Sequence, residues 1–537
     1  MSTTPELTLE TFIILPFQLE WSDGKAPSIG TRADELKRLG WQPIEGHAFD
    51  PIAASKLSPE QIARVQYQAY NYFHPFVRAF WFNDDIVQRY RHPALHALEA
   101  TLGSGDCVRF DACCDLLLFQ PNIAVLILHL KGKSPLPLPT VEDCLDQLRR
   151  VYPSYIATAV EDGHSPEDVR LIDSNDQTFA SYDVTAHAGE LQRRAKALMH
   201  SPSADDRRRH LWAPHWAELL QGIATQPGHN YALQAFQLGD DRAALASMLS
   251  IKRTAYQKKF TALIDTGHMA RLCFADQAGT DLLPYSKRFL ADFKARYCYD
   301  RFWYCNGESS HSPSRILNCG YAFTWLGNAD DAPFFANEND GAPVTFRHIY
   351  VPMAIIAHLQ KASLLVTARK LADLTPYKND GALSPLDPES FDQIKRHFMA
   401  FTQTYWFEEI TPQEQGIELY DMFKRHLRLQ AHYEANRQAI QDIVEHIDTR
   451  QSERLNRIAQ LFAVFGIALA ILSLAVGLLG INTFQLEDNH ATPIHLPHWV
   501  LDFINEGLVA NVHLLTSSAL ILALAGTCII FKRCIGR

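Results

Sequence analysis

The sequence predicts an α/β head, a long helical stalk and two membrane-spanning helices at the C-terminal end. Strand-like apolar segments alternate with helical patterns over residues 1–385, which is typical of an α/β core. From Gln413 to Asn482 no proline interrupts a long helical pattern. Two uncharged runs, 458–486 and 507–531, are each longer than the roughly 20 apolar residues that cross a bilayer.

The length of 537 residues exceeds the usual ~100 to 200 residues per domain, so the chain is expected to divide into several segments. They are a cytosolic α/β domain (1–385), cytosolic helices including the stalk from about 412 (386–457), a first transmembrane helix (458–486), an outer loop (487–506), a second transmembrane helix (507–531) and a basic cytosolic tail (532–537).

Composition narrows the classes of partner. The net charge of −10 disfavours a nucleic-acid partner, which usually requires a basic face. The ten cysteines form no CxxC pair, so we expect reduced thiols rather than a zinc site or a disulfide framework. The first ten residues have neither the basic start nor the apolar core of a signal peptide, so the N-terminus is expected to stay in the cytosol.

Basic residues orient the two predicted spans. Arg450, Arg454 and Arg457 precede the first span, and a basic tail that begins at Lys532 follows the second. The connection between the spans, 483–506, contains no lysine or arginine. The positive-inside rule therefore predicts that both termini are cytoplasmic and that the connection lies outside.

The outer connection is acidic. Its carboxylates would make a negative mouth that concentrates cations, although a polar outer loop without lysine is equally expected from topology alone. Three histidines in the loop are of a type that binds zinc, and exposed loop histidines without a function are at least as common. The carboxylates are Glu487, Asp488, Asp502 and Glu506, and the histidines are His490, His495 and His498.

A capping pattern marks the start of the stalk. Thr411 is a predicted N-cap, Pro412 suits the first helical position and Glu414 completes a capping box. If residues 412–482 form one helix, its length is roughly 105 Å. Tyr433, Ile440 and Ile447 recur every seven residues, which favours self-association through a short seam.

Small residues line one face of the first predicted span. One interpretation is tight packing between helices, and the other is a pore lined by symmetric copies, with the phenylalanine as a hydrophobic constriction. The residues of this face are Phe462, Gly466, Ala470, Ser473 and Gly477.

Gly480, Ile481 and Asn482 close the first span. This Gly-x-Asn, with two C-terminal spans, a long preceding helix and a basic tail, resembles the CorA-type divalent cation channels and transporters. Those carry Gly-Met-Asn, and the isoleucine makes this chain look more like the ZntB-type branch. The resemblance implies a homopentamer with an α/β cytosolic funnel. It also implies a pore lined by the first span, in which backbone carbonyls and Asn482 hold a hydrated cation.

The chain departs from the family in three respects. The isoleucine leaves magnesium and zinc both open, the outer connection is longer than usual, and the cytosolic part is larger. The resemblance also places Asp421 near the position of an acidic residue that helps magnesium-sensing members bind a regulatory metal between protomers. An ordinary surface aspartate is the simpler explanation of this residue.

The head is predicted from short apolar segments and two longer helical patterns, and residues 160–345 are the least informative part. No phosphate-binding loop, HExxH helix or nucleophile elbow occurs, so no enzymatic activity is expected. The expected elements are a strand at 11–18, a hairpin of 115–120 with 123–132, and helices at 141–150, 349–374 and 390–409.

Together these observations predict a multi-pass inner-membrane protein that associates with itself in the lipid bilayer. We expect it to conduct a divalent cation, Mg²⁺ or Zn²⁺, and to hold no cofactor beyond a transported or regulatory ion. The alternative is a ligand-gated membrane effector or sensor whose enlarged head binds a ligand or a protein. A membrane-tethered enzyme is disfavoured because no catalytic motif is present.

Overall fold

A computed structural model describes the chain as two units, Met1–Ala439 and Ile440–Arg537. The described residues are 5–21, 29–44, 58–119, 122–151, 165–183, 212–220, 233–238, 242–252, 264–279, 285–303, 313–374 and 387–483, with single residues between 186 and 223. The predicted outer loop (487–506), second transmembrane helix (507–531) and basic tail (532–537) lie outside them.

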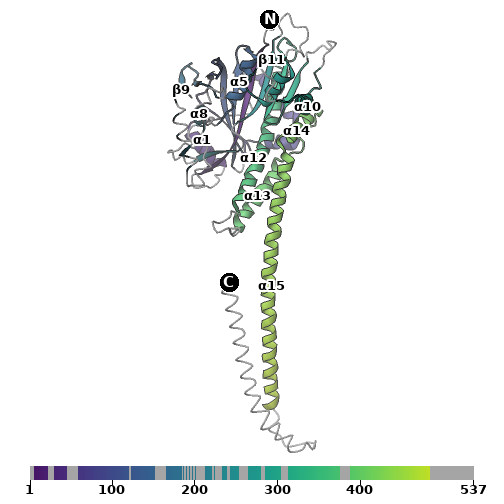
Figure 1. Cartoon of the computed structure of the whole chain (residues 1–537). Coiled ribbons are helices and arrows are strands. Elements are labelled where there is room, and N and C mark those ends of the chain that lie inside the picture. Colours follow the sequence, from purple (N-terminus) through teal and green to yellow (C-terminus); the bar gives the residue numbers. More distant parts are fainter. Residues whose placement is uncertain are drawn as a thin grey trace, which may run out of the picture. The chain divides into compact units, whose positions relative to one another are not determined.

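One large mixed sheet organises the first unit (Figure 1). Its strands are β1 (Glu6–Trp21), β2 (Gln42–Pro43), β3 (Gln88–Arg91), β4 (Ala97–Thr101), β5 (Cys107–Phe119), β6 (Ile123–Gly132), β7 (Leu136–Pro137), β8 (Asp168–Ile172), β9 (Thr178–Asp183), β10 (Leu233–Gln237), β11 (Ala244–Ile251), β12 (Cys298–Tyr299), β13 (Arg315–Asn318) and β14 (Ala322–Asn328).

The strand order is β12-β13-β14-β11-β1-β6-β5-β4-β8-β9, so β1 lies at the centre. Only β11 and β14 pair in parallel among the described strands, with Leu245 opposite Ala322. The predicted hairpin is present, since β5 and β6 pair antiparallel over their whole facing length. The predicted strand at 11–18 is the middle of the longer β1.

Helices cover both faces of the sheet. They are α1 (Ile29–Arg38), α3 (Pro59–Tyr72), α4 (Pro75–Trp81), α5 (Leu138–Gln147), α8 (Pro214–Leu219), α9 (Thr266–Phe274), α10 (Lys287–Tyr297), α11 (Ala342–Thr345), the π-helix η2 (Phe346–Tyr350), α12 (Val351–Leu374), α13 (Pro388–Thr404), α14 (Glu414–Leu427) and α15 (Leu429–Thr483).

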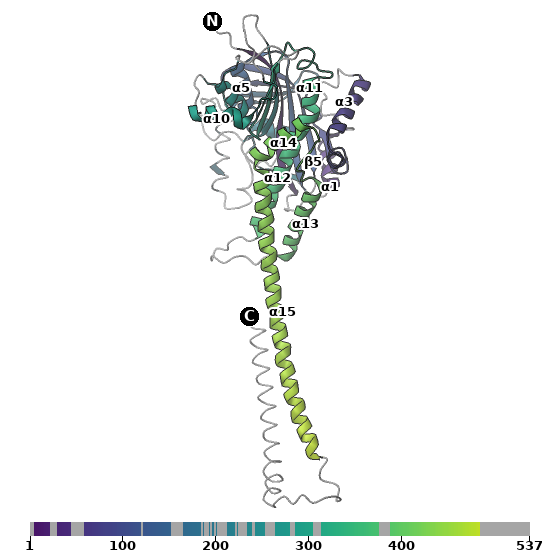
Figure 2. The same cartoon turned by 90° about the vertical axis from the view of Figure 1, so that its right-hand side faces the viewer.

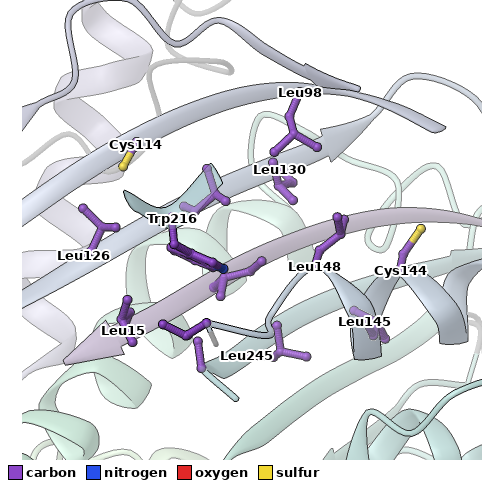
Figure 3. Close-up of a cluster of buried hydrophobic side chains, with 14 of the residues drawn as sticks. Leu15, Leu98, Cys114, Leu126, Leu130, Cys144, Leu145, Leu148, Trp216 and Leu245 are labelled. Atoms are coloured by element: carbon purple, nitrogen blue, oxygen red, sulfur yellow. The ribbon is translucent and has the colours of Figure 1, made fainter. Parts of the chain in front are cut away.

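Alternation along the strands separates the two faces. On β1, Ile13 and Leu15 belong to the hydrophobic core beneath α5, α8 and α9. Figure 3 shows Leu15 with Leu145 of α5 and Trp216 of α8 in this cluster. Phe12, between them in the alternation, points to the opposite face, where its ring stacks on His129 at a centroid distance of 4.0 Å.

Helices η2 and α12 cover that opposite face. Phe346 of η2 lies edge-on to Phe12, and Tyr350 packs on Trp325 of β14. Figures 1 and 2 both show α12 along the sheet beside α14, and these elements are in contact. The predicted helix at 349–374 is therefore present, preceded by a π-turn that the sequence did not indicate.

The predicted helix at 390–409 is too long. Helix α13 ends at Thr404, because Tyr405 adopts the non-helical angles φ −148° and ψ 17°. Tyr405 and Phe407 are nevertheless buried, as their aromatic pattern predicted. At the other end of the head, the helix expected at 141–150 begins earlier, with a proline in its first turn, and ends at Gln147.

The predicted continuous stalk is wrong. Arg428, between α14 and α15, has φ 56° and ψ 39°, a left-handed conformation that breaks the helix. Lys361 of α12 donates through Nζ to the carbonyl of Leu427 at 3.0 Å, which satisfies one of the open acceptors at the end of α14. The predicted cap is also wrong, since α14 begins after Gln413 and Thr411 donates instead to the carbonyl of Tyr72 at 2.6 Å.

A buried ion pair joins β1 to η2. Both carboxylate oxygens of Glu10 accept from Arg347, each at 2.6 Å, and His129 Nε2 lies 2.9 Å from the same carboxylate. Glu338 adds a contact of 2.7 Å to Arg347 and one of 3.0 Å to Lys131. Burial alone would raise the pKa of Glu10, but the charge and hydrogen bonds of Arg347, together with those of His129, hold it well below its usual range.

Replacing Arg347 with methionine should destabilise the first unit strongly. The change leaves the buried carboxylate of Glu10 without its main partner, which typically costs about 3–5 kcal/mol. The measurement is thermal unfolding of the full chain in detergent. The control is Arg396→Met, which removes an exposed pair with Asp392 on α13 and should leave the melting temperature nearly unchanged. Equal melting temperatures of the two variants would contradict this account of the pair.

The same pair predicts the direction of the pH dependence. Because the folded-state pKa of Glu10 is lowered, its stabilising contribution is fully present above the ordinary glutamate pKa of about 4. It is lost as the pH falls toward the folded-state pKa. The difference in melting temperature between the wild type and Arg347→Met should therefore shrink below about pH 4. A difference that stays constant down to pH 3 would contradict this assignment.

Candidate functional site

Two helices are long and apolar enough to span a membrane, 342–374 and 429–474, with mean hydropathies of 1.5 and 2.0 in their most apolar windows. The environment of the two differs. In the first, 83% of the apolar window is buried, whereas none of the window in the second is buried. The first is therefore the core helix of the α/β unit. The second, within α15, is the candidate membrane segment.

Large apolar side chains on α15 are exposed on all sides of the helix. Covering even five of them would contribute roughly 7 to 15 kcal/mol, as much as the whole folding stability of a typical domain. A helix that is apolar all round is typical of a membrane span or a buried core. The exposed residues are Leu455, Ile458, Phe462, Val464, Phe465, Ile467, Leu469, Ile471, Leu472 and Leu474.

The predicted small-residue face lies on α15. Because α15 is continuous from Leu429 to Thr483, positions 462, 466, 470, 473 and 477 fall within about 80° of arc. Phe462 is 73% exposed, and a Cβ added at Gly466 would meet no atom within 4 Å. The described part of this face is thus uncovered in the single chain. Whether it lines a pore or packs against another helix stays a prediction.

The predicted selectivity motif lies at the end of the same helix. Gly480, Ile481 and Asn482 belong to the last turn of α15, which ends at Thr483. The acidic residues predicted to form the outer mouth lie outside the described residues. They are Glu487, Asp488, Asp502 and Glu506.

Asp421, the predicted regulatory metal ligand, lies on α14. Its carboxylate pairs with Lys424 Nζ at 2.9 Å, and the same ammonium reaches Glu408 at 3.5 Å. A metal ion bound to Asp421 would have to compete with this ammonium. Within the described part of the chain, no group of three or more His, Cys, Asp or Glu residues is placed to hold a metal ion.

Aromatic stacking fixes the start of α15 in the first unit. Tyr433 stacks on Trp406 with centroids 4.6 Å apart, and on Phe398 of α13 at 5.6 Å. Asn436 donates through Nδ2 to the carbonyl of Leu364 in α12 at 2.8 Å, and this contact is buried. The sequence pattern placed Tyr433 in a self-association seam. In the structure it instead packs against the chain's own α13 and the segment that follows it.

A buried polar group ties α12 to α14. Gln360 donates to the carbonyl of Tyr405 at 2.9 Å and accepts from the hydroxyl of Tyr420 at 2.7 Å. All three residues are buried. Burial raises the pKa of Tyr420, which keeps the phenol protonated and able to donate.

Sequence reasoning missed these connections, although it had a usable indicator. Glu10 interrupts an apolar strand, and Gln360 interrupts an apolar helical run. A polar side chain at a core position requires a partner, because burying it unpaired is costly. The partners, Arg347 and Tyr420, lie far away in the sequence, so the pattern indicates the need for a partner but not its identity.

Comparisons with known proteins give little further information. No protein-family model matches the chain, and no curated protein matches it. One solved structure, described as the structure of the full-length CmaX protein, is similar over 54% of this chain and 94% of that chain. The sequence identity is 12% and the TM-score 0.19, which is too low to support an argument.

Replacing Tyr420 with phenylalanine should weaken the attachment of α14. The change removes the only hydroxyl in the Tyr420–Gln360 contact and leaves a buried amide oxygen unsatisfied, at a cost of about 1–3 kcal/mol. The measurement is again thermal unfolding of the full chain. Tyr67→Phe, on the exposed side of α3, is the matched control and should leave the melting temperature unchanged. If both variants melt together, the contact does not stabilise this junction.

Proposed function

We propose that the chain is a divalent cation channel or transporter of the inner membrane, assembled as a homopentamer around its first transmembrane helix. The observation that carries the proposal is the uncovered apolar length of α15, which ends on Gly480, Ile481 and Asn482. A membrane accounts for the exposed apolar residues, and a pore accounts for the small residues along one side.

In this proposal, Gly480 and Asn482 form the outer selectivity region, and the face from Phe462 to Gly477 forms the conduction path. Mg²⁺ gives up its water reluctantly, so amide oxygens that contact the hydrated ion select it without binding it too tightly. A ring of carboxylates at the same point would retain the ion. The acidic outer residues would instead raise the local concentration of cations, whether Mg²⁺ or Zn²⁺.

A second candidate is a ligand-gated effector. The observation that favours it is the set of buried contacts from the sheet to the first turns of α15, which includes Arg347, Gln360 and Tyr433. A ligand that changed the packing of α12 would act directly on this set. The two candidates differ in one measurable respect, since the effector conducts only when its head is occupied.

The proposed orientation can be tested by protease protection. In inverted inner-membrane vesicles the head should be digested, while in spheroplasts it should be protected, because both termini are expected in the cytosol. A tag inserted after Glu487 should show the opposite pattern. A head that is cleaved in intact spheroplasts would exclude the proposed orientation.

Metal flux tests the proposed activity. Proteoliposomes should take up Mg²⁺ or Zn²⁺ selectively, and Asn482→Leu should reduce the uptake by at least about ten-fold, the equivalent of ~1.4 kcal/mol of lost interaction. Asn511→Leu, which removes an amide from the second predicted span, is the matched control and should conduct normally. Absence of flux of both ions in a folded oligomer would reject the channel and leave the ligand-gated effector.

A further inference from the structure

A pocket in the first unit lies between the sheet and α12. It encloses about 390 Å³, including solvent at its open mouth. Four of its residues, at positions 358, 361, 362 and 365, recur at the spacing of one helix face on α12. The others come from the end of β1, the start of β11 and the turn before β14. They are Leu15, Pro16, Leu238, Arg242, Ala243, Ala244 and Tyr321.

The ionisable side chains that line this pocket are basic or phenolic. Arg242 and Lys361 carry the charge, and Tyr321 adds a hydroxyl on the exposed side. His358 is buried, and burial lowers its pKa to about 4, so it is neutral at pH 7. No carboxylate is among the described lining residues, in a chain whose net charge is −10. Asp240 and Asp241, which precede Arg242, lie outside the described residues.

Two further cations stand behind the first two. Arg149 is buried, and both its burial and the charge of Arg242 lower its pKa. Burial and the charge of Arg428 lower the pKa of Lys361 to about 8. The counter-charge of Arg242 is distant, since Asp276 lies 3.9 Å away. These cations therefore repel one another at close range, and a bound anion would relieve that repulsion.

We propose that this pocket binds a phosphoryl group, either as free phosphate or as the phosphate of a small ester. The planar fork of Arg242 and the ammonium of Lys361 suit a group that offers three acceptor oxygens. A phosphate carries about −1.5 to −2 charges at pH 7, which matches two cations better than a carboxylate does. The open mouth leaves room for the rest of an ester. This inference does not rest on the channel proposal.

The location gives the site a consequence for the stalk. The ammonium of Lys361 also holds the carbonyl of Leu427, next to the helix break at Arg428. A phosphoryl group that attracts this ammonium competes with that contact. Occupancy of the pocket thus bears directly on the junction of α14 with α15.

Calorimetric titration of the full chain in detergent tests the proposal. The probes are inorganic phosphate and adenosine 5′-monophosphate, in a buffer free of phosphate and divalent ions. Arg242→Gln and Lys361→Gln should each weaken binding by about ten-fold or more, because each removes one charge-assisted hydrogen bond. Lys294→Gln, which removes an exposed cation on α10, is the control and should bind as the wild type does.

The two probes separate the two sources of the phosphoryl group. Equal affinity for both indicates a site for free phosphate, and tighter binding of the ester indicates that its remainder occupies the mouth. No saturable binding of either probe below about 10 mM would overturn the proposal. Equal binding by the wild type and Arg242→Gln would overturn it as well. Arg242→Gln decides the outcome if Lys361→Gln unfolds, because Arg242 is partly exposed and its loss should not disturb the fold.

Discussion

The buried pairing of Glu10 with Arg347 is the constraint on which the arrangement of the first unit depends. Two charges removed from water are tolerated only when their geometry is nearly complete, and here the carboxylate takes two bonds from the guanidinium and a third from His129. The pair joins the central strand to the π-turn that starts α12. Since α12 in turn contacts α13 and α14, a shift at this pair would displace every helix that leads to the stalk.

Each helix after α12 is held by a polar contact set among apolar ones. Gln360 connects α12 to Tyr420 of α14, and one turn of sequence later Lys361 holds the last carbonyl of α14. Hydrophobic packing alone would let helices slide with little loss, whereas a buried hydrogen bond is lost outright when its partners separate. These contacts therefore fix the register of the helices. The pocket and the stalk junction share Lys361, so they are one side chain apart.

Local patterns predicted those parts of the structure that depend on local interactions. The apolar alternation of β1, the hairpin of β5 with β6 and the aromatic pattern of 398–407 all indicated buried elements that are present. The break at Arg428 was missed because no glycine or proline marks it and a contact from α12 sustains it. The basic pocket was missed for the same reason. Its lining is drawn from residues between 15 and 365, and no short motif can encode such a set.

The apolar surface of α15 can be covered in two ways, and the helix offers a separate side for each. The small residues 462, 466, 470 and 473 occupy one arc, on which close approach of another helix is possible. Val464, Ile467 and Ile471 lie on the opposite side by the same helical geometry, where their bulk suits lipid chains. A core helix has no need of such a division, and α12 is instead buried for most of its length. The asymmetry of α15 is therefore the feature that a lone membrane anchor does not explain and that an assembly of copies around an axis does.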